Sequence, residues 1–380
     1  MTAWTPVCRV CRRANPGTWS RCPHCDGVQV LDAPPAASGT ADPAAEGLWR
    51  HRAGLPRVGE EISLGEGDTP LVRCPRLAGV GGVADLLVKN ETANPTLSFK
   101  DRAMALGVSL ARTHDVPGVV AASTGNTAVA AAAYAARAGL PCRIVCAADG
   151  PKPRLARSLG ADVRLVGGDF SGAYATAAEL EADGWFPLTT TFRNPYLTEA
   201  HRTVAFEIHE RIGTPDWVIV PVGAGPLLAG IHHGFRALAA AGRADRTPRL
   251  VAVQTEACAP LAAAWAGDGT AVTAVRPGPT VAEAIADPLR GYEDEGLITL
   301  AAVRESGGTV VAVPDVEIVE AVRAFARLEG LSVEPAAAAP LAALRRLTSA
   351  GAVAPDARVV LVATGHGAKE PLTVEEDDEW

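Results

Sequence analysis

Four of the eight cysteines lie within the first 25 residues, where Cys8-x2-Cys11 and Cys22-x2-Cys25 form two pairs separated by ten residues. Two residues between thiols allow a tight turn to point both sulfurs at one ion, and two such turns complete a tetrahedral site. Thiolates favour Zn(II), with iron as the rarer occupant. Two disulfides are the alternative, which fits less well with a chain that carries four further scattered cysteines. The spacing therefore predicts a structural zinc site, because four protein ligands leave no position open for a substrate.

A lysine is the next candidate for chemistry. Lys100 lies in residues 94–102, Asn-Pro-Thr-Leu-Ser-Phe-Lys-Asp-Arg, directly before a predicted helix over residues 103–112. Because the helix dipole disfavours positive charge at a helix start, a lysine there is a poor choice for stability alone. The position suits a lysine kept as a neutral amine or as an imine with a carbonyl compound. The alternative is a solvated surface lysine, since lysine is rarely buried.

Two further segments are candidates for binding anions. Residues 123–127, Ser-Thr-Gly-Asn-Thr, precede an alanine-rich helix predicted over residues 128–137, with a stop at Gly139. They predict a side-chain N-cap, with spare backbone amides for a carboxylate or phosphate. Residues 221–230 are glycine-rich and follow a predicted strand, so their amides are expected to surround a phosphate. Leu228 stands where a dinucleotide-binding motif needs glycine, which favours a cofactor with a single phosphate.

These segments need a sheet to position them. From about residue 85 onward, short β-branched stretches alternate with Ala/Leu/Arg stretches of helical period, the pattern of an α/β fold with a mainly parallel sheet. Such sheets bind ligands beyond the carboxyl ends of their strands, so chemistry is expected in the loops that follow the strands. The expected strands cover residues 85–88, 143–146, 217–220, 250–253 and 359–362.

Length and composition limit the class of protein. The 380 residues are enough for two to three domains of roughly 150 residues each. A formal net charge of −8 and a pI near 5.6 argue against nucleic acid or an anionic membrane surface as a partner. No apolar run reaches the roughly 18 residues of a membrane span, and the N-terminus lacks a basic region followed by an apolar core. A cytoplasmic enzyme is therefore expected.

The cysteine-rich start and the body are separated by a change in composition. Residues 1–31 are expected to form the zinc ribbon, and the small, proline-rich residues 32–46 a linker. At the other end, residues 373–380 are expected to be an acidic, solvated tail. Three histidines, His232, His233 and His366, lie near the candidate loops, and packing or surface roles are expected for them.

Together the motifs resemble the threonine synthase family of fold-type II, tryptophan synthase β-like, pyridoxal-phosphate (PLP) enzymes. That resemblance implies two three-layer αβα domains with mainly parallel sheets, preceded by a zinc ribbon that part of the family carries. Residues 47–119 with 191–372 would form the large PLP-binding domain, and residues 120–190 a small mobile domain. A homodimer is also implied. The matching segments are residues 64–71 (Leu-Gly-Glu-Gly-Asp-Thr-Pro-Leu), 94–102, 123–126, 194–196, 334–335 and 364–367.

The resemblance also implies roles for single residues. Lys100 would bind PLP covalently and, once released, move protons at the substrate Cα. Asn126 would bond the ring hydroxyl, and Thr364 the pyridine nitrogen, which favours elimination and replacement over transamination. The implied cofactor contacts are Phe99, Lys100, Asn126, Gly223, Ala224, Gly225, Pro226, Leu227 and Thr364. The implied substrate contacts are Ser98, Ser123, Thr124, Gly125 and Arg193.

The implied reaction is that of a PLP-dependent carbon–oxygen lyase of amino-acid biosynthesis, acting on a side-chain-activated amino acid. In threonine synthases it converts O-phosphohomoserine and water to threonine and phosphate. Two alternatives stay open. One is a related lyase or synthase that uses another leaving group, as in O-phosphoserine, serine or an amino acid of specialised metabolism. The other is a non-catalytic ligand-binding or sensor protein on the same fold, against which the intact Lys100 argues.

The chain departs from the family where a substrate phosphate would bind. The family's Asn-Ser-x-Asn-Pro-x-Arg segment is Thr-Phe-Arg-Asn-Pro-Tyr-Leu here, over residues 191–197, so its Asn, Ser and Arg are all replaced. Leucine in place of arginine removes a charge-assisted, often bidentate contact. Arg193, Arg202 and Lys152 are the cations expected to compensate. Leu97 also stands where the family usually has glycine.

Overall fold

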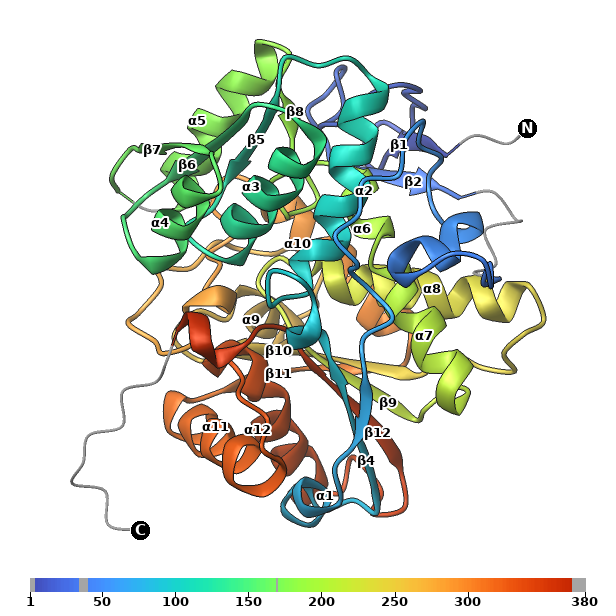
Figure 1. Cartoon of the computed structure of the whole chain (residues 1–380). Helices are drawn as coiled ribbons and strands as arrows, with labels where there is room; N and C mark the ends of the chain where they lie inside the picture. Colours follow the sequence, from blue (N-terminus) through green and yellow to red (C-terminus); the bar gives the residue numbers. More distant parts are fainter. Residues whose placement is uncertain (1–3, 34–39, 169, 371–380) are drawn as a thin grey trace.

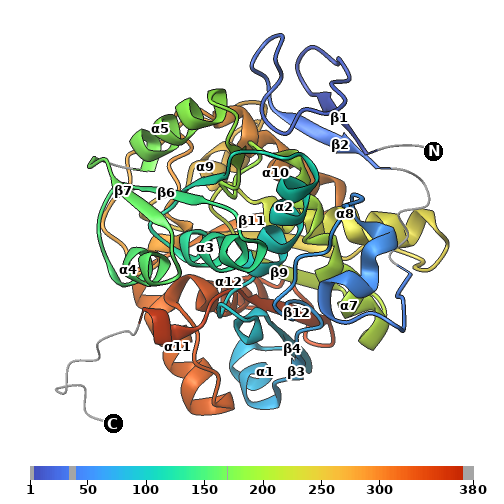
Figure 2. The ribbon, with the colours of Figure 1, turned by 45° about the horizontal axis from the view of Figure 1, so that its top comes forward.

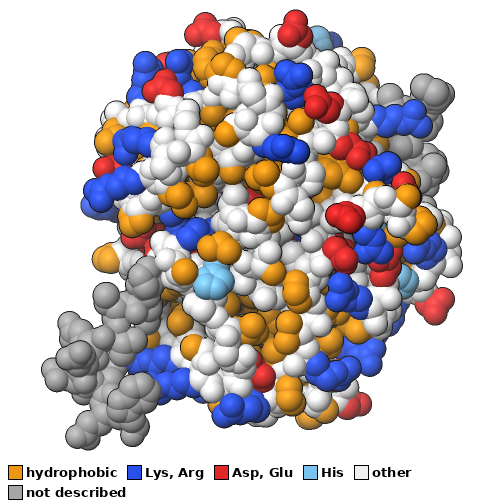
Figure 3. Space-filling model, viewed as in Figure 1, with side chains coloured by type: hydrophobic (Ala, Val, Ile, Leu, Met, Phe, Trp, Pro, Cys, Tyr) orange, Lys and Arg blue, Asp and Glu red, His pale blue; other side chains and the backbone are white. Residues whose placement is uncertain are grey.

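The computed structural model describes residues 4–33, 40–168 and 170–370. The predicted acidic tail over 373–380 and residues 34–39 of the predicted linker lie outside these ranges. Figures 1 and 2 show a body built on two sheets, with the cysteine-rich N-terminal unit packed against one side of it. Figure 3 shows basic and acidic side chains interspersed over one face of the body, without a large patch of either sign.

The larger sheet has six strands in the order β11-β10-β9-β12-β4-β3. All neighbours are parallel except β3 and β4, which run antiparallel. Four of the five expected strands lie in this sheet, which confirms them. The strands are β3 (Leu71–Arg73), β4 (Asp85–Asn90), β9 (Trp217–Pro221), β10 (Arg249–Thr255), β11 (Thr309–Val313) and β12 (Arg358–Ala363).

Helices cover both faces of this sheet because its central strands are apolar on both sides. Along β9, Val218 and Val220 pack in one buried cluster, and Trp217 and Ile219 in the cluster on the opposite face. Figure 1 shows α1, α11 and α12 on one side, and α7 and α8 on the other. The helices outside the second sheet are α1 (Pro75–Gly81), α2 (Lys100–Thr113), α6 (Pro195–Glu199), α7 (Arg202–Ile212), α8 (Pro226–Ala240), α9 (Pro260–Ala266), α10 (Glu293–Glu305), α11 (Asp315–Glu329) and α12 (Pro335–Ser349).

The second sheet has four parallel strands in the order β7-β6-β5-β8. It contains the fifth expected strand. That residues 120–190 form a small mobile domain stays a prediction. Its strands are β5 (Val119–Ala122), β6 (Cys142–Cys146), β7 (Asp162–Leu165) and β8 (Phe186–Pro187), with helices α3 (Asn126–Ala138), α4 (Pro151–Ser158) and α5 (Phe170–Ala182). Within the described residues, no helix is both long and apolar enough to span a membrane.

The N-terminal unit pairs β1 (Thr5–Cys8) with β2 (Gln29–Asp32) in an antiparallel ribbon. Val28 packs in a small buried cluster with Phe192 and Ile298 of the body. The ribbon is therefore docked on the body by apolar contact as well as by polar contacts described below.

Candidate active site and metal centre

The segment before Lys100 is paired with the segment after the last strand. Ser98 forms an antiparallel bridge with Gly365, and the amide of Phe99 donates to the carbonyl of Thr364 at 3.0 Å. Lys100 is the first residue of α2. Two motifs from opposite ends of the body thus meet at the carboxyl edge of β4 and β12, as expected for a parallel sheet.

Leu97 has a backbone conformation that glycine adopts more easily than leucine. Its φ is +63°, in the left-handed region that residues with a Cβ rarely adopt. The amide of Leu97 donates to Asn94 at 2.8 Å, and its carbonyl accepts from His366 at 3.0 Å, so both neighbouring segments hold this conformation. The strained residue lies three positions before the candidate reactive lysine.

The amine of Lys100 has a defined setting. Nζ donates to Thr190 Oγ1 at 2.6 Å and lies 4.5 Å from the centroid of the Phe99 ring. Thr190 in turn shares a hydrogen bond with Thr127 at 2.7 Å. Burial lowers the pKa of Lys100 to about 8, against the opposing effect of the Asp287 carboxylate. A lysine with this pKa supplies neutral amine near neutral pH, as covalent chemistry with a carbonyl compound requires.

The loop over residues 123–127 differs from the expected N-cap. The N-cap residue of α3 is Gly125, and no described side chain caps the helix. Ser123 Oγ accepts from the Gly125 amide at 3.0 Å, and Asn126 Nδ2 donates across the site to Glu334 Oε2 at 2.8 Å. The predicted side-chain cap is therefore wrong, because Ser123 bonds within the loop and Asn126 already belongs to the helix. The start of α3 is left for a ligand.

The glycine-rich loop before α8 has the form of an anion cradle. Gly225 has a φ of +102°, and a Cβ there would lie 2.2 Å from Thr299 Oγ1. A Cβ on Gly223 would lie 3.0 Å from the Cβ of Asp287. No side chain among the described residues caps the fifteen-residue helix that follows. The sequence therefore needs these glycines for the backbone to surround an anion at the helix start.

A cavity of about 550 Å³ joins these loops. It lies where the carboxyl ends of strands from both sheets meet, and Lys100 and the start of α8 are both in its wall. Twelve of the residues expected at the site line it: Phe99, Lys100, Ser123, Thr124, Gly125, Asn126, Gly223, Ala224, Gly225, Pro226, Leu227 and Thr364.

Two expected substrate contacts lie elsewhere. Ser98 is fully buried beside the cavity, where its hydroxyl has no partner among the described residues. Arg193 donates to both carboxylate oxygens of Glu181, at 2.6 and 2.7 Å, and lies over the Tyr174 ring. The geometry therefore does not bring Arg193 to the cavity, because an acid outside the wall holds it.

The other two cations expected to compensate are also held by carboxylates. Arg202 is buried and pairs with Glu199 at 3.0 Å. Lys152 pairs with Glu334 at 2.9 Å and with Glu370 at 2.7 Å. Neither cation is in the cavity wall.

Sequence reasoning missed three groups in the wall. Thr190 holds the Lys100 amine, Glu334 bonds Asn126, and Asp287 lies beside the glycine loop. In the sequence, Thr190 is distinguished only by its place in a run of three threonines over residues 189–191. Glu334 belongs to the matching segment over residues 334–335, but the sequence indicated no role for it. Nothing in the local sequence indicates a role for Asp287.

A buried ionic cluster fixes the start of α2 behind the lysine. Arg102 bonds Glu91 at 2.7 Å and Glu207 at 2.5 Å, and Lys89 bonds Glu207 at 2.5 Å. Burial opposes ionisation of Glu207, but Arg102 and Lys89 outweigh it and lower the pKa of this carboxyl. The cluster joins β4, α2 and α7, so it orients the helix that carries Lys100.

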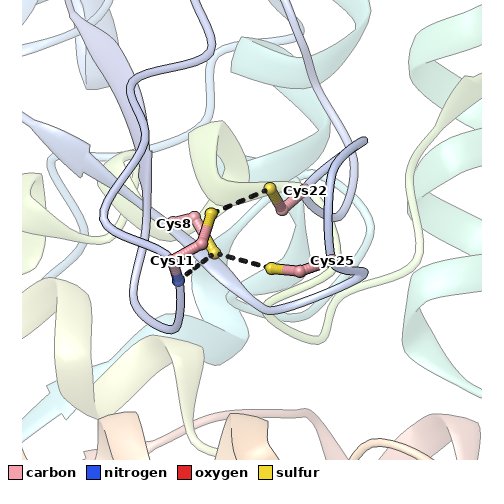
Figure 4. Close-up of side chains that lie close together, drawn as sticks. All are labelled: Cys8, Cys11, Cys22 and Cys25. Carbon is pink, nitrogen blue, oxygen red and sulfur yellow. Dashed lines mark hydrogen bonds between the residues drawn. The ribbon is translucent and has the colours of Figure 1, made fainter.

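The four N-terminal cysteines converge on one point, as Figure 4 shows. Cys8 and Cys25 have their sulfurs 3.5 Å apart, Cys11 and Cys22 have theirs 3.7 Å apart, and all four ligand atoms lie within 4.8 Å of one another. None of the eight cysteines forms a disulfide. Zn–S bonds of about 2.3 Å in a tetrahedron place sulfurs about 3.8 Å apart, so this donor set fits Zn(II).

Comparison with known proteins agrees with this geometry. Residues 62–365 match the family model described as pyridoxal-phosphate dependent enzyme. A threonine synthase of Methanosarcina acetivorans is 38% identical over 334 residues, covering 86% of this chain and 81% of its own length. One of Methanocaldococcus jannaschii is 38% identical over 335 residues, with the same coverages. A solved structure of maize serine racemase matches in fold, with a TM-score of 0.67 at 21% identity, over 82% of this chain and 91% of that one.

Proposed function

Because this chain belongs to the family of pyridoxal-phosphate dependent enzymes, we propose that it eliminates or replaces a group on the side chain of an amino acid. The observation that carries the proposal is the half-buried Lys100 amine, whose pKa burial lowers to about 8, beside a glycine cradle in one cavity. The substrate is a small amino acid, and PLP is the cofactor of the family.

The residues present fit PLP. One buried oxygen of Asn126 has no partner among the described residues, and the start of α8 carries no side-chain cap, so a ring substituent and a phosphate both have a place. Lys100, Asn126, Thr364 and the loop over residues 223–227 would hold the group. When bound, PLP supplies an electron sink that weakens the bonds to the substrate Cα.

The chain's own groups would do the rest. Lys100 Nζ would take the proton from Cα and return it, since its lowered pKa allows both states near neutral pH. The start of α3 would bind the substrate carboxylate through its backbone amides. Thr364 offers a hydroxyl rather than a carboxylate to the ring nitrogen, which favours elimination or replacement over transamination.

Threonine synthase activity is the first candidate within this class, since it is the activity named for the relatives. The test is to supply O-phosphohomoserine to cofactor-loaded protein and to measure phosphate and threonine, with O-phosphoserine and serine in parallel. Threonine formed in equal amount with phosphate supports this candidate. No turnover by protein with an intact cofactor absorbance band contradicts it.

A second candidate, a lyase or synthase with another leaving group, is favoured by the charges of the cavity. Lys100 is the one basic residue among the described residues of its wall, and the three cations expected to bind a substrate phosphate are elsewhere. A sensor role without catalysis would require that the amine of Lys100 does not react, which cofactor uptake measures directly.

Two further proposals concern the whole chain. The four N-terminal cysteines would hold one Zn(II), because their sulfur spacing suits it. The chain would form a homodimer and its second sheet would move relative to the first, as the resemblance implies. Sedimentation measures whether the chain forms a homodimer. Exchange of amide hydrogens with and without substrate measures whether the second sheet moves.

A further inference from the structure

The charges that face the cavity are mostly acidic. Lys100 is the one base among the described residues of the wall, whereas Glu283, Asp287 and Glu334 are acids. In the proposed function the amine of Lys100 is committed to the cofactor, whose phosphate adds further negative charge. A substrate phosphate would therefore enter a site of its own sign, without the arginine that normally binds it.

The three acids are not equivalent. Glu334 is paired with Lys152 at 2.9 Å and accepts from Asn126 at 2.8 Å, so its charge is balanced. Glu283 is exposed at the start of a short helical turn (Glu283–Ile285), where solvent screens it. Asp287 has no cation bonded to it among the described residues. It is the acid whose charge a substrate would meet.

Asp287 is held rigidly. Its Oδ1 accepts from the Tyr292 hydroxyl at 2.6 Å and from the Leu289 amide at 3.0 Å. Tyr292 is buried and stacks on Tyr174 with ring centroids 4.6 Å apart. Leu289 is fully buried with a φ of +56°, so packing holds the loop in a conformation that it would not adopt alone.

The second carboxyl oxygen is available to a ligand. Both hydrogen bonds that the described residues give to Asp287 end on Oδ1, which leaves Oδ2. Asp287 lines the cavity beside Gly223, whose added Cβ would lie 3.0 Å from the Cβ of Asp287. Burial raises the pKa of this carboxyl, and the Lys100 amine opposes that effect.

We propose that Asp287 selects the substrate by its leaving group: Oδ2 bonds an uncharged side-chain hydroxyl and disfavours a phosphate ester in the same place. The substrate class is thus an amino acid with a free hydroxyl on its side chain. The inference rests on the proposed function and favours its second candidate, with a hydroxyl as the leaving group, over turnover of O-phosphohomoserine.

The elimination step balances with groups already named. Asp287 is a carboxylate when the substrate binds, and its raised pKa allows it to take up one proton from solvent beside the bound hydroxyl. The substrate loses a proton from Cα to Lys100 Nζ, its Cβ–oxygen bond breaks, and a Cα=Cβ double bond forms. The proton on Asp287 Oδ2 joins the leaving oxygen, which departs as water, so Asp287 is again a carboxylate, and Lys100 returns its proton to solvent.

The experiment compares ligands that differ only in the ester. Calorimetric titration of the cofactor-loaded protein with L-serine and O-phospho-L-serine, and with L-homoserine and O-phospho-L-homoserine, measures discrimination as a ratio of dissociation constants. We expect each free hydroxyl compound to bind about tenfold or more tightly than its ester. In Asp287→Asn, which keeps the shape, that ratio should fall about tenfold, and kcat for the hydroxyl substrate should fall about a hundredfold with little change in KM.

Two variants serve as controls. Glu283→Gln removes the same charge from an exposed position of the same loop and should change the ratio less than about twofold, because the charge is screened. Tyr292→Phe removes one hydrogen bond from Asp287 without changing its charge, and should lower kcat while preserving the preference for the free hydroxyl.

Two results separate failure of this inference from failure of the proposed function. Tighter binding of the esters, with a ratio that Asp287→Asn leaves unchanged, overturns the role of Asp287 although the protein still holds its cofactor covalently. If the protein fails to take up the cofactor on Lys100, by absorbance and by mass after borohydride reduction, the proposed function itself is overturned.

Discussion

At Lys100, backbone pairing and burial act on the same amine. The Ser98–Gly365 bridge fixes where α2 begins, and Thr190 orients Nζ at 2.6 Å. Replacement of the lysine removes the nucleophile but leaves this scaffold. We therefore expect Lys100→Ala to lose turnover by a factor of about a thousand or more and to carry no cofactor mass after borohydride reduction. Thr190→Val is the matched control, which should keep the covalent cofactor because the lysine is intact.

The same amine predicts how cofactor uptake depends on pH. Burial lowers the pKa of Lys100 to about 8, so the amine of the cofactor-free protein is protonated below that pH and neutral above it. Only the neutral amine attacks a carbonyl group. The uptake rate should thus rise through pH 8 and level off above it, as stopped-flow absorbance can follow. A rate that still rises at pH 10 would mean that the lysine behaves like a solvated one.

The role of a single residue could be predicted from the sequence where one local motif is enough to identify that role. Lys100, Asn126 and the glycine loop belong to such motifs, and the structure brings them to one cavity. Asp287 was not predictable, because its place beside the cofactor loop depends on packing against Gly223, which lies in a distant segment of the chain. Arg193 was expected at the site because of its charge and its place in residues 191–197, but it is held by Glu181, which lies earlier in the chain on α5.

At the scale of elements, the strands that were predicted are mostly buried, and each contains Val or Ile. The strands that were not predicted include β7, which is largely exposed, and β8, which has two residues and ends in proline. Neither has a hydrophobic period that a sequence can reveal. The helices predicted over residues 103–112 and 128–137 begin earlier in the structure, at Lys100 and Asn126, and the side-chain cap expected for α3 was wrong because glycine occupies the N-cap.

The cysteine ribbon carries a prediction at this scale. It has few apolar contacts of its own, so a metal ion should supply much of its stability. The double variant Cys8→Ser with Cys11→Ser should lose its zinc, from about one ion per chain to near none by elemental analysis, and the ribbon should become sensitive to protease. Cys142→Ala changes a buried cysteine of the body and should retain the metal. Equal zinc in both variants would contradict the proposed ligands.

Across the whole molecule, a series of contacts joins the ribbon to the cavity. Arg21, next to Cys22, bonds Asp294 at 2.8 Å and lies 3.5 Å from Glu295. Glu295 accepts from the Tyr174 hydroxyl at 3.2 Å. Tyr174 stacks on Tyr292, whose hydroxyl bonds Asp287. Three parts of the chain, the ribbon, α5 and α10, therefore share the support of one wall of the site.

This series predicts that the ribbon affects the body through Arg21. Burial raises the pKa of Glu295 from 4.5 to about 7, and Arg21 opposes the rise. Since the folded carboxyl has the higher pKa, ionisation costs stability as pH increases from 4.5 to 7, and the loss is complete above that range. Arg21→Ala should increase this loss and also remove the bond to Asp294, so its melting temperature should lie below the wild type throughout, by least near pH 4.5 and by most above pH 7.

The same variant tests whether the support reaches catalysis. With Glu295 less well held, Tyr174 and Tyr292 lose their fixed position, and we expect kcat/KM to fall about threefold to tenfold while the zinc content stays the same. Arg12→Ala, an exposed residue of the ribbon, is the matched control and should change neither quantity. Unchanged kcat/KM in Arg21→Ala, together with the expected pH-dependent melting, would show that the ribbon stabilises the wall without influencing the chemistry inside it.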